Sequence, residues 1–301
     1  MQWDRAAGRA ARMAFDDWIT FMDLVVWTHC PPIDDVLKAK RHGVITVLAP
    51  LWHEFRPEHR ELYPIFDRII VPSQEIGRFA IRCGGGNRVF APTWDPGLPL
   101  LRKLSRSTAA PALLLPLFDA DPRRIEDAIL DVLGRILEEF LTVTLTVAYN
   151  TSTVAPFVKR RIKRYSKCFN GRVKAITGVH PDYRPLLYCT HDLMVWPVDR
   201  VDVGLSALTA LSVSTPVIHF DIPPTRELLP RHTAVAVPCP QESTETGVPV
   251  GRPVGYDVFH GHLRDCVGSP ERLAELHRAG LHGLEHRRRL FNEVIKTALT
   301  P

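Results

Sequence analysis

Short apolar runs and longer amphipathic stretches alternate along most of this 301-residue chain. Runs with the length and apolar character of a buried strand occupy residues 23–29, 44–48, 67–73, 112–117, 141–148, 172–176, 192–197 and 215–220. Apolar runs that alternate with helical patterns are typical of a parallel sheet covered by helices on both faces. The pattern therefore predicts an α/β protein with Rossmann-like, doubly wound parallel sheets.

Helical spacing of apolar positions predicts a helix in most of the intervening stretches. These are residues 1–20, 34–40, 57–66, 123–139, 154–167, 181–188, 205–211 and 270–297. Residues 238–255 instead form a polar segment rich in Pro, Gly and Thr, for which we expect a long mobile loop. Strands and helices thus follow one another in the order that a parallel sheet requires.

The length of the chain indicates two domains, because a single doubly wound domain has about 100–200 residues. Residues 96–111 are rich in Pro, Leu and basic residues without clear periodicity, which is typical of a linker. We therefore predict an N-terminal domain over residues 1–100, a linker over 101–111 and a C-terminal domain over 112–275. The helix in residues 276–301 is long enough to cross back to the first domain.

Residues 192–228 organise the predicted second domain. The apolar run that ends at Trp196 and Pro197 is followed by Gly204, a short buried helix and a second apolar run that Pro223 and Pro224 halt. This is a βαβ unit, in which the loop and the helix N-terminus can face a phosphate. Candidate donors to such a phosphate are the backbone amides of Val203, Gly204 and Leu205, since a glycine lets the phosphate approach closely.

The same stretch resembles the donor-binding signature of the GT-B glycosyltransferases, especially the retaining family 4. The matching residues are Gly204, Leu205, Leu208, Ala210, Pro216, Val217, Ile218, Asp221, Pro223 and Glu227. Val201 and Thr209 stand where that family has two glutamates, which contact the donor sugar and its ribose. Asp202 is one residue away and is a candidate for the ribose contact, or else a solvated loop carboxylate. Glu227 either contacts the donor sugar or caps the following helix.

A second segment extends the resemblance. Val173 to Gly178 and Val179, through Tyr188 and Asp192 to Pro197, follow the family pattern V-x-F-x-G-x-V-x-x-x-x-L-x-x-x-Y-x-x-x-D-x-x-x-x-P. By this resemblance, backbone groups at Gly178, Val179 and His180 hold the nucleobase. The resemblance implies a GT-B architecture, with two Rossmann-like domains facing a central cleft and a nucleotide sugar, in particular a UDP-sugar, as the co-substrate.

The first domain resembles the same enzymes in the order of its elements. One strand ends at His29, a second ends near His53, and a third ends in Val71-Pro72-Ser73. Those enzymes begin with a Gly-rich loop and a further strand and helix, so this domain looks shortened. His29 is the first candidate for a catalytic or acceptor-orienting residue and His53 the second, because a neutral imidazole can take a hydroxyl proton near pH 7. The alternative for both is a structural role.

Breaking a sugar–diphosphate bond requires fixed positive charge beside the leaving phosphate. Family 4 enzymes place an Arg and a Lys after the first strand of their second domain. Leu117 stands at the Arg position here, and Arg123 and Arg124 lie close to the expected Lys. They are candidate phosphate ligands, or else ordinary surface charge in a helix's first turn. Because fixed cations and backbone amides at a helix N-terminus can stabilise the leaving phosphate without a metal, we expect a metal-independent reaction without a further cofactor.

The positive charge points to an anionic partner. The formal net charge is +5 and the pI is near 9.0, which suits a nucleotide sugar, a nucleic acid or an acidic membrane surface. One predicted helix concentrates the charge in Lys159, Arg160, Arg161, Lys163, Arg164 and Lys167. These six cations are either a solvated face or a surface that holds the phosphates of DNA or of an anionic membrane.

Several activities remain open from the sequence. Phage enzymes that glycosylate hydroxymethylated DNA bases share the GT-B architecture, and such a base is the acceptor we favour. Enzymes that extend polysaccharides or lipid-linked glycans at a membrane are an alternative. A non-catalytic GT-B module that binds a nucleotide or a partner chain, and a nucleotide-sugar 2-epimerase of the same fold, are further alternatives.

The sequence also predicts where the protein resides. No apolar run reaches the roughly 18 residues that a transmembrane helix needs, and the arginines near the N-terminus lack a following apolar signal region. The six cysteines are far apart, without a metal-binding spacing. These patterns are typical of a cytoplasmic protein with reduced thiols.

Overall fold

The computed structural model describes residues 2–4, 9–11, 15–50, 59–92, 110–118, 126–150, 154–198, 204–229, 232–243, 249–251 and 256–300. The chain divides into two compact units. Unit 1 consists of residues 1–92, 245–248 and 292–301, and unit 2 of residues 93–244 and 249–291. The predicted domain boundary at residue 100 and nearly all of the predicted linker fall in residues 93–109, outside the described residues.

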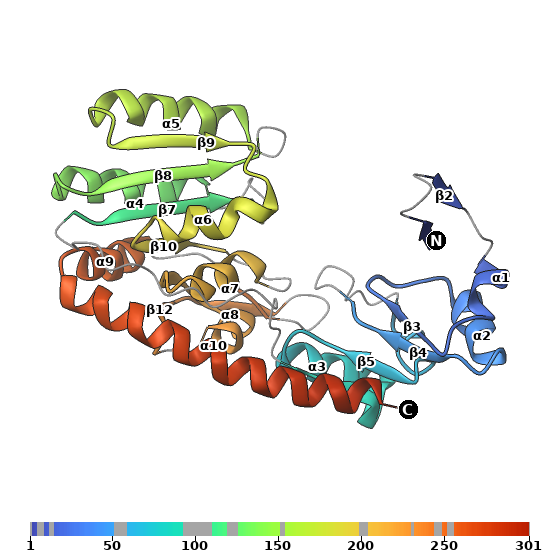
Figure 1. Cartoon of the computed structure of the whole chain (residues 1–301). Helices are drawn as coiled ribbons and strands as arrows, with labels where there is room; N and C mark the ends of the chain where they lie inside the picture. The colour runs from blue at the N-terminus through green and yellow to red at the C-terminus, as the bar shows by residue number, and fades with distance from the viewer. Residues whose placement is uncertain are drawn as a thin grey trace. The chain divides into compact units, whose positions relative to one another are not determined.

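Unit 1 contains a four-stranded parallel sheet in the order β3-β4-β5-β6 (Figure 1). Its strands are β3 (Leu24–Trp27), β4 (Ile45–Leu48), β5 (Arg68–Ile70) and β6 (Val89–Phe90). Helix α2 (Ile33–Arg41) connects β3 to β4, and α3 (Gln74–Ala80), η3 (Ile81–Gly85) and η4 (Gly86–Arg88) connect β5 to β6. The strands predicted in residues 44–48 and 67–73 and the helix predicted in residues 34–40 are confirmed.

A polar network joins β4 to β5. Asp67 Oδ2 accepts hydrogen bonds from the amide of Thr46 at 2.9 Å and from its hydroxyl at 2.7 Å, and Asp67 Oδ1 lies 2.5 Å from Lys40 Nζ. Burial raises the pKa of Asp67, but the hydrogen bonds from Lys40 and Thr46 outweigh it, so that the pKa lies below its ordinary value. The network therefore fixes the register of the two strands with a charged carboxylate.

Three predictions for unit 1 are wrong. Residues 1–20 are not one helix: β1 (Gln2–Asp4) pairs antiparallel with β2 (Arg9–Ala11), and α1 (Phe15–Ile19) is the helical part of what the structure describes here. Gly8 in the middle of this stretch disfavours a continuous helix. Residues 60–65 form turns, because Pro64 cannot continue a helix. The parallel strand predicted in residues 23–29 is confirmed as β3, but its predicted burial is wrong, because β3 lies at the edge of the sheet with Val26 44% exposed.

Unit 2 contains a six-stranded parallel sheet in the order β12-β11-β10-β7-β8-β9. Its strands are β7 (Ala112–Leu117), β8 (Thr144–Tyr149), β9 (Val173–Thr177), β10 (Leu193–Trp196), β11 (Val217–Asp221) and β12 (Ala234–Pro238). The first five confirm the predicted strands, whereas β12 was not predicted. The α/β fold class with parallel sheets in both units is confirmed.

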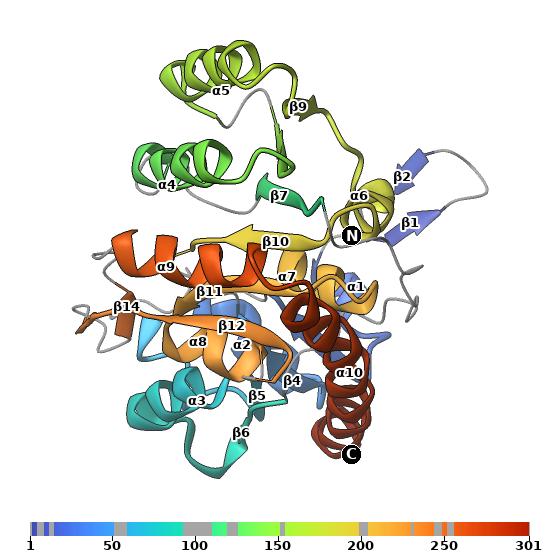
Figure 2. The same ribbon diagram turned by 90° about the vertical axis from the view of Figure 1, so that its left-hand side faces the viewer.

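Helices cover both faces of the six-stranded sheet. They are α4 (Glu126–Glu139), α5 (Pro156–Cys168), α6 (Arg184–Cys189), α7 (Leu205–Ser212), α8 (Pro223–Leu228), α9 (Tyr256–Val267) and α10 (Pro270–Leu299), with a 3-10 turn, η5 (Pro181–Tyr183), before α6. Helix α4 packs against α5 and α9, and α6 packs against α7. Figure 2 shows α4, α5 and α9 on one side of the strands and α6 and α7 on the other.

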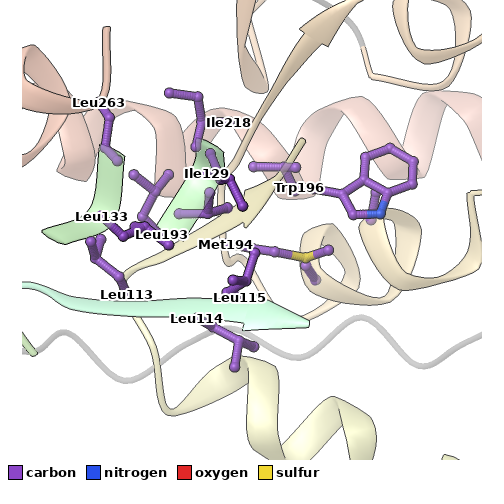
Figure 3. Packing of buried hydrophobic residues seen from close by; sticks show 14 of the residues in the cluster. Leu113, Leu114, Leu115, Ile129, Leu133, Leu193, Met194, Trp196, Ile218 and Leu263 are labelled. Atoms are coloured by element: carbon purple, nitrogen blue, oxygen red, sulfur yellow. The ribbon is translucent and has the colours of Figure 1, made fainter. Parts of the chain in front are cut away.

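The main core lies between β7, β10 and β11 and the layer that contains α4 and α9. Figure 3 shows Leu113 and Leu193 of the sheet with Ile129 and Leu133 of α4 and Leu263 of α9, and all five are buried. Because successive strand residues point to opposite faces, both faces of β7 are apolar, as the run of leucines predicts. This core fixes the positions of the strand ends.

The C-terminal third contains a hairpin that was not predicted. The polar segment 238–255 is not a continuous loop, because β13 (Gln241–Ser243) and β14 (Pro249–Gly251) pair as an antiparallel hairpin. Helix α10 contributes to both units, and its residues 292–299 belong to unit 1. There Ala298 is buried against Val47 and Ile70, and Arg68 Nη1 donates to the Ala298 carbonyl at 2.7 Å.

Candidate functional site

The strand order of unit 2 defines one position where a ligand crevice is expected. From β7 the chain builds β8 and β9 on one side, and after β9 it returns to place β10, β11 and β12 on the other. The switch point therefore lies between the carboxyl ends of β7 and β10. In open parallel sheets, ligands bind at such a point, beyond the strand ends.

The segment after β10 leads into the N-terminus of α7. Gly204 precedes the helix with φ 64° and ψ 32°, a left-handed conformation that strongly favours glycine. The first helical hydrogen bond runs from the amide of Leu208 to the carbonyl of Gly204 at 2.9 Å. The amides of Leu205, Ser206 and Ala207 therefore have no carbonyl acceptor within the helix. Together with the helix dipole, they can bind an anion.

Ser206 is a second polar feature at this helix end. Its side chain is only 3% exposed, and its hydroxyl has no hydrogen-bond partner among the described residues. In an α-helix, the Cα–Cβ bond is tilted toward the N-terminus, so the Ser206 side chain leans toward the free amides. A buried hydroxyl without a partner is destabilising, and a bound anion at this helix end would supply one. Ser206 was not predicted, although its place as the second residue of the predicted helix could be read from the sequence.

A cation from another element lies at the end of β7. Arg184, the first residue of α6, places its guanidinium carbon 4.4 Å from the centre of the Phe118 ring. Phe118 directly follows β7. Figure 1 shows α6 beside the arrowhead of β7. Arg184 was not predicted, because 66 positions separate it from Phe118 (184 − 118).

The residues predicted to hold a nucleobase follow the outermost strand. Gly178 comes directly after β9 with φ 69°, and no atom would lie within 4 Å of an added Cβ. Val179 is half-buried, and the His180 side chain is 65% exposed. The amide of Asp182 lies 3.4 Å from His180 Nδ1. This short polar loop belongs to the same carboxyl edge as the end of β7, with β8 between them.

Glu227 lies within α8, so it does not cap a following helix, and that alternative is wrong. Its side chain is half-buried, and its carbonyl oxygen accepts a hydrogen bond from Arg287 Nη2 at 2.8 Å. Arg287 is 5% exposed. Helix α10 is therefore fixed to α8 through the buried guanidinium of Arg287, which was not predicted.

Buried His219 lies in β11, opposite Trp196 of β10. Its Nδ1 is 2.7 Å from the Phe220 carbonyl oxygen, so Nδ1 carries the hydrogen and donates it. Its Nε2 has no partner among the residues that the structure describes. Burial lowers the pKa of His219 to about 4, which leaves the ring neutral at neutral pH.

The other predicted site residues fall in different places. His29 is exposed and follows β3, at the carboxyl edge of the sheet in unit 1. Outside the described residues lie His53, Arg123, Arg124, Asp202 and Val203. The structure therefore places Gly178, Gly204 and Leu205 of the predicted set at one sheet edge, and it adds Arg184 and Ser206 to them.

The predicted cations of α5 form a surface row. Arg160, Lys163, Arg164 and Lys167 line an open hollow of about 360 Å³ together with Cys168. Arg161 differs from them, because its Nη2 pairs with Asp131 and its guanidinium carbon lies 5.6 Å from the centre of the Tyr165 ring. Lys159 is half-buried. We call the four hollow-lining cations the basic row.

Among the described residues, no group of three or more His, Cys, Asp or Glu side chains could hold a metal ion. In the described part of the chain, no helix has both the length and the apolar character needed to cross a membrane.

Comparison with known proteins identifies the fold. No family model matches the sequence, and no curated protein matches it. A glycosyltransferase from Rickettsia africae is similar in structure, with a TM-score of 0.71 and 10% identity over 94% of this chain and 79% of that chain. HepE from Anabaena, in complex with UDP and glucose, has a TM-score of 0.65 and 13% identity over 95% of this chain and 80% of its own.

A third similar structure is TarM from S. aureus in a complex that contains UDP, with a TM-score of 0.63 and 9% identity over 88% of this chain and 53% of that chain. At these identities, the likeness establishes the fold. The chain has the fold of the GT-B glycosyltransferases, with a parallel sheet in each of two α/β units.

Proposed function

We propose that this protein is a glycosyltransferase that takes its sugar from a nucleotide sugar, in particular a UDP-sugar. The observation that carries the proposal is the N-terminus of α7 at the switch point. There, left-handed Gly204 precedes amides without an acceptor in the helix, and the hydroxyl of buried Ser206 has no partner among the described residues. The GT-B fold and the UDP complexes of HepE and TarM support it. So does the resemblance of residues 204–227 to the family 4 signature.

The proposed chemistry follows from the leaving group. Negative charge develops on the diphosphate as the bond to the sugar breaks, and amides fixed at a helix N-terminus stabilise that charge without reorganisation. In this proposal the donor's diphosphate lies at α7. Its base lies beside Gly178, Val179 and His180, and its sugar is in reach of Glu227.

Acceptor activation is assigned to unit 1. We propose that His29, with its exposed side chain at the end of β3, orients the acceptor hydroxyl or takes its proton. His53 is the second candidate for this role. The proposed contacts to the donor still include Arg123, Arg124, Asp202 and Val203. The reaction is proposed to need no metal ion.

The basic row favours an anionic acceptor. Four neighbouring cations on one helix face can neutralise successive phosphates of a polymer. A 5-hydroxymethylated base in DNA remains the acceptor that we propose to test first. An alternative acceptor is a polysaccharide or lipid-linked glycan at a membrane surface. An alternative function is that of a non-catalytic nucleotide-binding module. The same experiment separates these alternatives.

The test is a transfer screen with the full chain. UDP-, GDP- and ADP-sugars are incubated with hydroxymethylcytosine-containing DNA, with unmodified DNA or without an acceptor, each with and without EDTA. Mass spectrometry then follows free nucleotide and glycosylated nucleoside. We expect nucleotide release from one UDP-sugar that EDTA does not abolish, and loss of transfer in His29→Ala with donor binding retained. Loss of all release with EDTA would contradict the metal-independent mechanism.

The basic row has its own matched comparison. Arg160→Glu/Arg164→Glu reverses two charges of the row, and Arg289→Glu/Lys296→Glu makes the same change of net charge on exposed positions of α10. We expect the α5 double variant to bind DNA more weakly and with a smaller dependence on salt concentration. The α10 double variant should bind DNA as the wild-type protein does. Sugar transfer without a DNA product rejects the DNA acceptor and keeps the transferase. Nucleotide binding without release from any donor supports the non-catalytic module.

A further inference from the structure

A positively charged side chain is expected beside the diphosphate, yet Leu117 occupies the last position of β7. Among the described residues, the cation at the end of β7 is Arg184, which belongs to α6. After β9 the chain turns at the carboxyl edge through η5, and α6 then runs back toward the start of β10. The first residue of α6, Arg184, therefore lies at the same edge as the ends of β7 and β10.

The contact with Phe118 fixes the guanidinium at that edge. Phe118 is the first residue after β7, the strand on one side of the switch point, and the guanidinium carbon of Arg184 lies 4.4 Å from its ring centre. Stacking on a ring occupies the face of a guanidinium and leaves its N–H groups in the plane, where they can bind a phosphate with two parallel hydrogen bonds. The aromatic contact thus holds the guanidinium at the end of β7.

The second side of the switch point is formed by α7. Helix α6 packs against α7, and both helices begin at the carboxyl edge of the sheet. A cation in the first turn of a helix is unfavourable against the helix dipole, so the position of Arg184 is not one that helix stability selects. The free amides of α7, the Ser206 hydroxyl and the Arg184 guanidinium lie at one sheet edge.

We propose that Arg184 is a ligand of the donor's diphosphate and that the Phe118 ring holds its guanidinium in place. This assignment rests on the proposed function, because it takes the ligand to be a nucleoside diphosphate in unit 2. In this assignment, the positive charge at the end of β7 comes from a residue of α6, the helix between β9 and β10. It does not come from the loop that directly follows β7.

The test measures the binding of UDP, uridine and pyrophosphate to the full chain by calorimetry. Arg184→Ala should weaken UDP and pyrophosphate binding about 10- to 100-fold and leave uridine binding unchanged, because the lost contact is a charge-assisted hydrogen bond to phosphate. Arg184→Lys should restore part of the UDP affinity. Phe118→Leu, which keeps the cation but removes its ring, should weaken UDP binding by a smaller factor.

The matched control is Arg272→Ala. Arg272 is exposed near the start of α10, which begins where α9 has returned to the opposite edge of the sheet, and its substitution removes the same charge from the same unit. Nucleotide affinity should not change in this variant. Thermal unfolding of every variant shows whether the fold is retained.

The outcomes separate this assignment from the proposed function. If the wild-type protein binds UDP and Arg184→Ala binds it equally well, the assignment of Arg184 is wrong and the proposed function stands. Equal weakening of UDP and uridine shows that Arg184 only supports the fold, which also overturns the assignment. If the wild-type protein binds none of UDP, GDP and ADP, both proposals fail.

Discussion

The carboxylate of Asp192 accepts a hydrogen bond from the amide of Ala112 at 2.9 Å, and the amide of Asp192 donates to the Ala112 carbonyl at 2.7 Å. The two residues are 80 positions apart and stand at the beginnings of β10 and β7. The side chain of Asp192 is 3% exposed. This reciprocal contact joins the two strands whose opposite ends define the candidate site.

We therefore expect Asp192→Ala to lower the free energy of unfolding by about 1–3 kcal/mol, because the amide of Ala112 loses its side-chain acceptor. Asp192→Asn keeps an acceptor oxygen and should cost less. Chemical denaturation measures both. Asp182→Ala is the control, since the Asp182 side chain is 84% exposed and its loss should change stability by no more than about 0.5 kcal/mol. Equal effects at both positions would contradict the structural role of Asp192.

Two glycines should respond to alanine with opposite signs. Gly204→Ala places a Cβ on left-handed backbone and should destabilise the protein by about 1–2 kcal/mol, with weaker UDP binding. Gly261 lies inside α9, and no atom would lie within 4 Å of an added Cβ. Gly261→Ala should therefore stabilise the protein by about 0.5–1 kcal/mol. Thermal unfolding of the two variants checks the signs, and a stabilised Gly204→Ala would exclude the left-handed conformation.

The buried His219 predicts an acid-dependent loss of stability. Its pKa is about 4 in the folded protein, because burial disfavours the charged ring, and 6.5 is its ordinary value. Between pH 6.5 and 4, the unfolded chain binds the proton that the folded chain excludes, so the free energy of unfolding falls as the pH falls. This group lowers the free energy of unfolding by roughly 3 kcal/mol at pH 4, and it has no effect well above pH 6.5.

Denaturation at several pH values measures this dependence. His219→Gln cannot titrate and should show a shallower loss of stability between pH 6.5 and 4 than the wild-type protein. His286→Gln, which changes an exposed histidine of α10, should follow the wild-type curve. Parallel curves for the wild-type protein and His219→Gln would show that His219 is not the group responsible.

The thiols should differ in reactivity. Burial raises the pKa of Cys266 to about 11, and its side chain is fully buried, so little thiolate forms and reagents cannot reach it. Cys168 is exposed at the end of α5. A thiol reagent followed by peptide mass spectrometry should label Cys168 in native buffer and Cys266 only after unfolding. Labelling of both at the same rate in native buffer would mean that α9 opens readily.

The sequence predicts those parts of the fold that depend on local patterns. The run Ala112–Leu117 matches β7 at both ends, because continuous apolar residues occur where a strand is buried on both faces. Gly204 was predicted as a site residue from its type and place, and its φ of 64° explains why a glycine stands there. The short strand β12 was missed, because its alternating alanines and valines give a weak signal.

Relationships between distant residues could not be predicted in the same way. The contact of Arg184 with Phe118 depends on the crossover from β9 to β10, which brings α6 to the end of β7. Arg161 was grouped with the other cations of α5, but Asp131 of α4 pairs with it. Such pairs depend on how helices pack across a sheet, and local periodicity carries no information about that packing.

The division of α10 has a consequence for the order in which the protein is completed during synthesis. Ala298 packs against Val47 and Ile70 and accepts a hydrogen bond from Arg68, a residue 230 positions earlier. All segments of unit 2 precede residue 292. The ribosome therefore makes the sheet of unit 1 first, but that unit obtains its last core residue only after the whole of unit 2 has been made. Until then the apolar surface of β4 and β5 that Ala298 covers stays exposed.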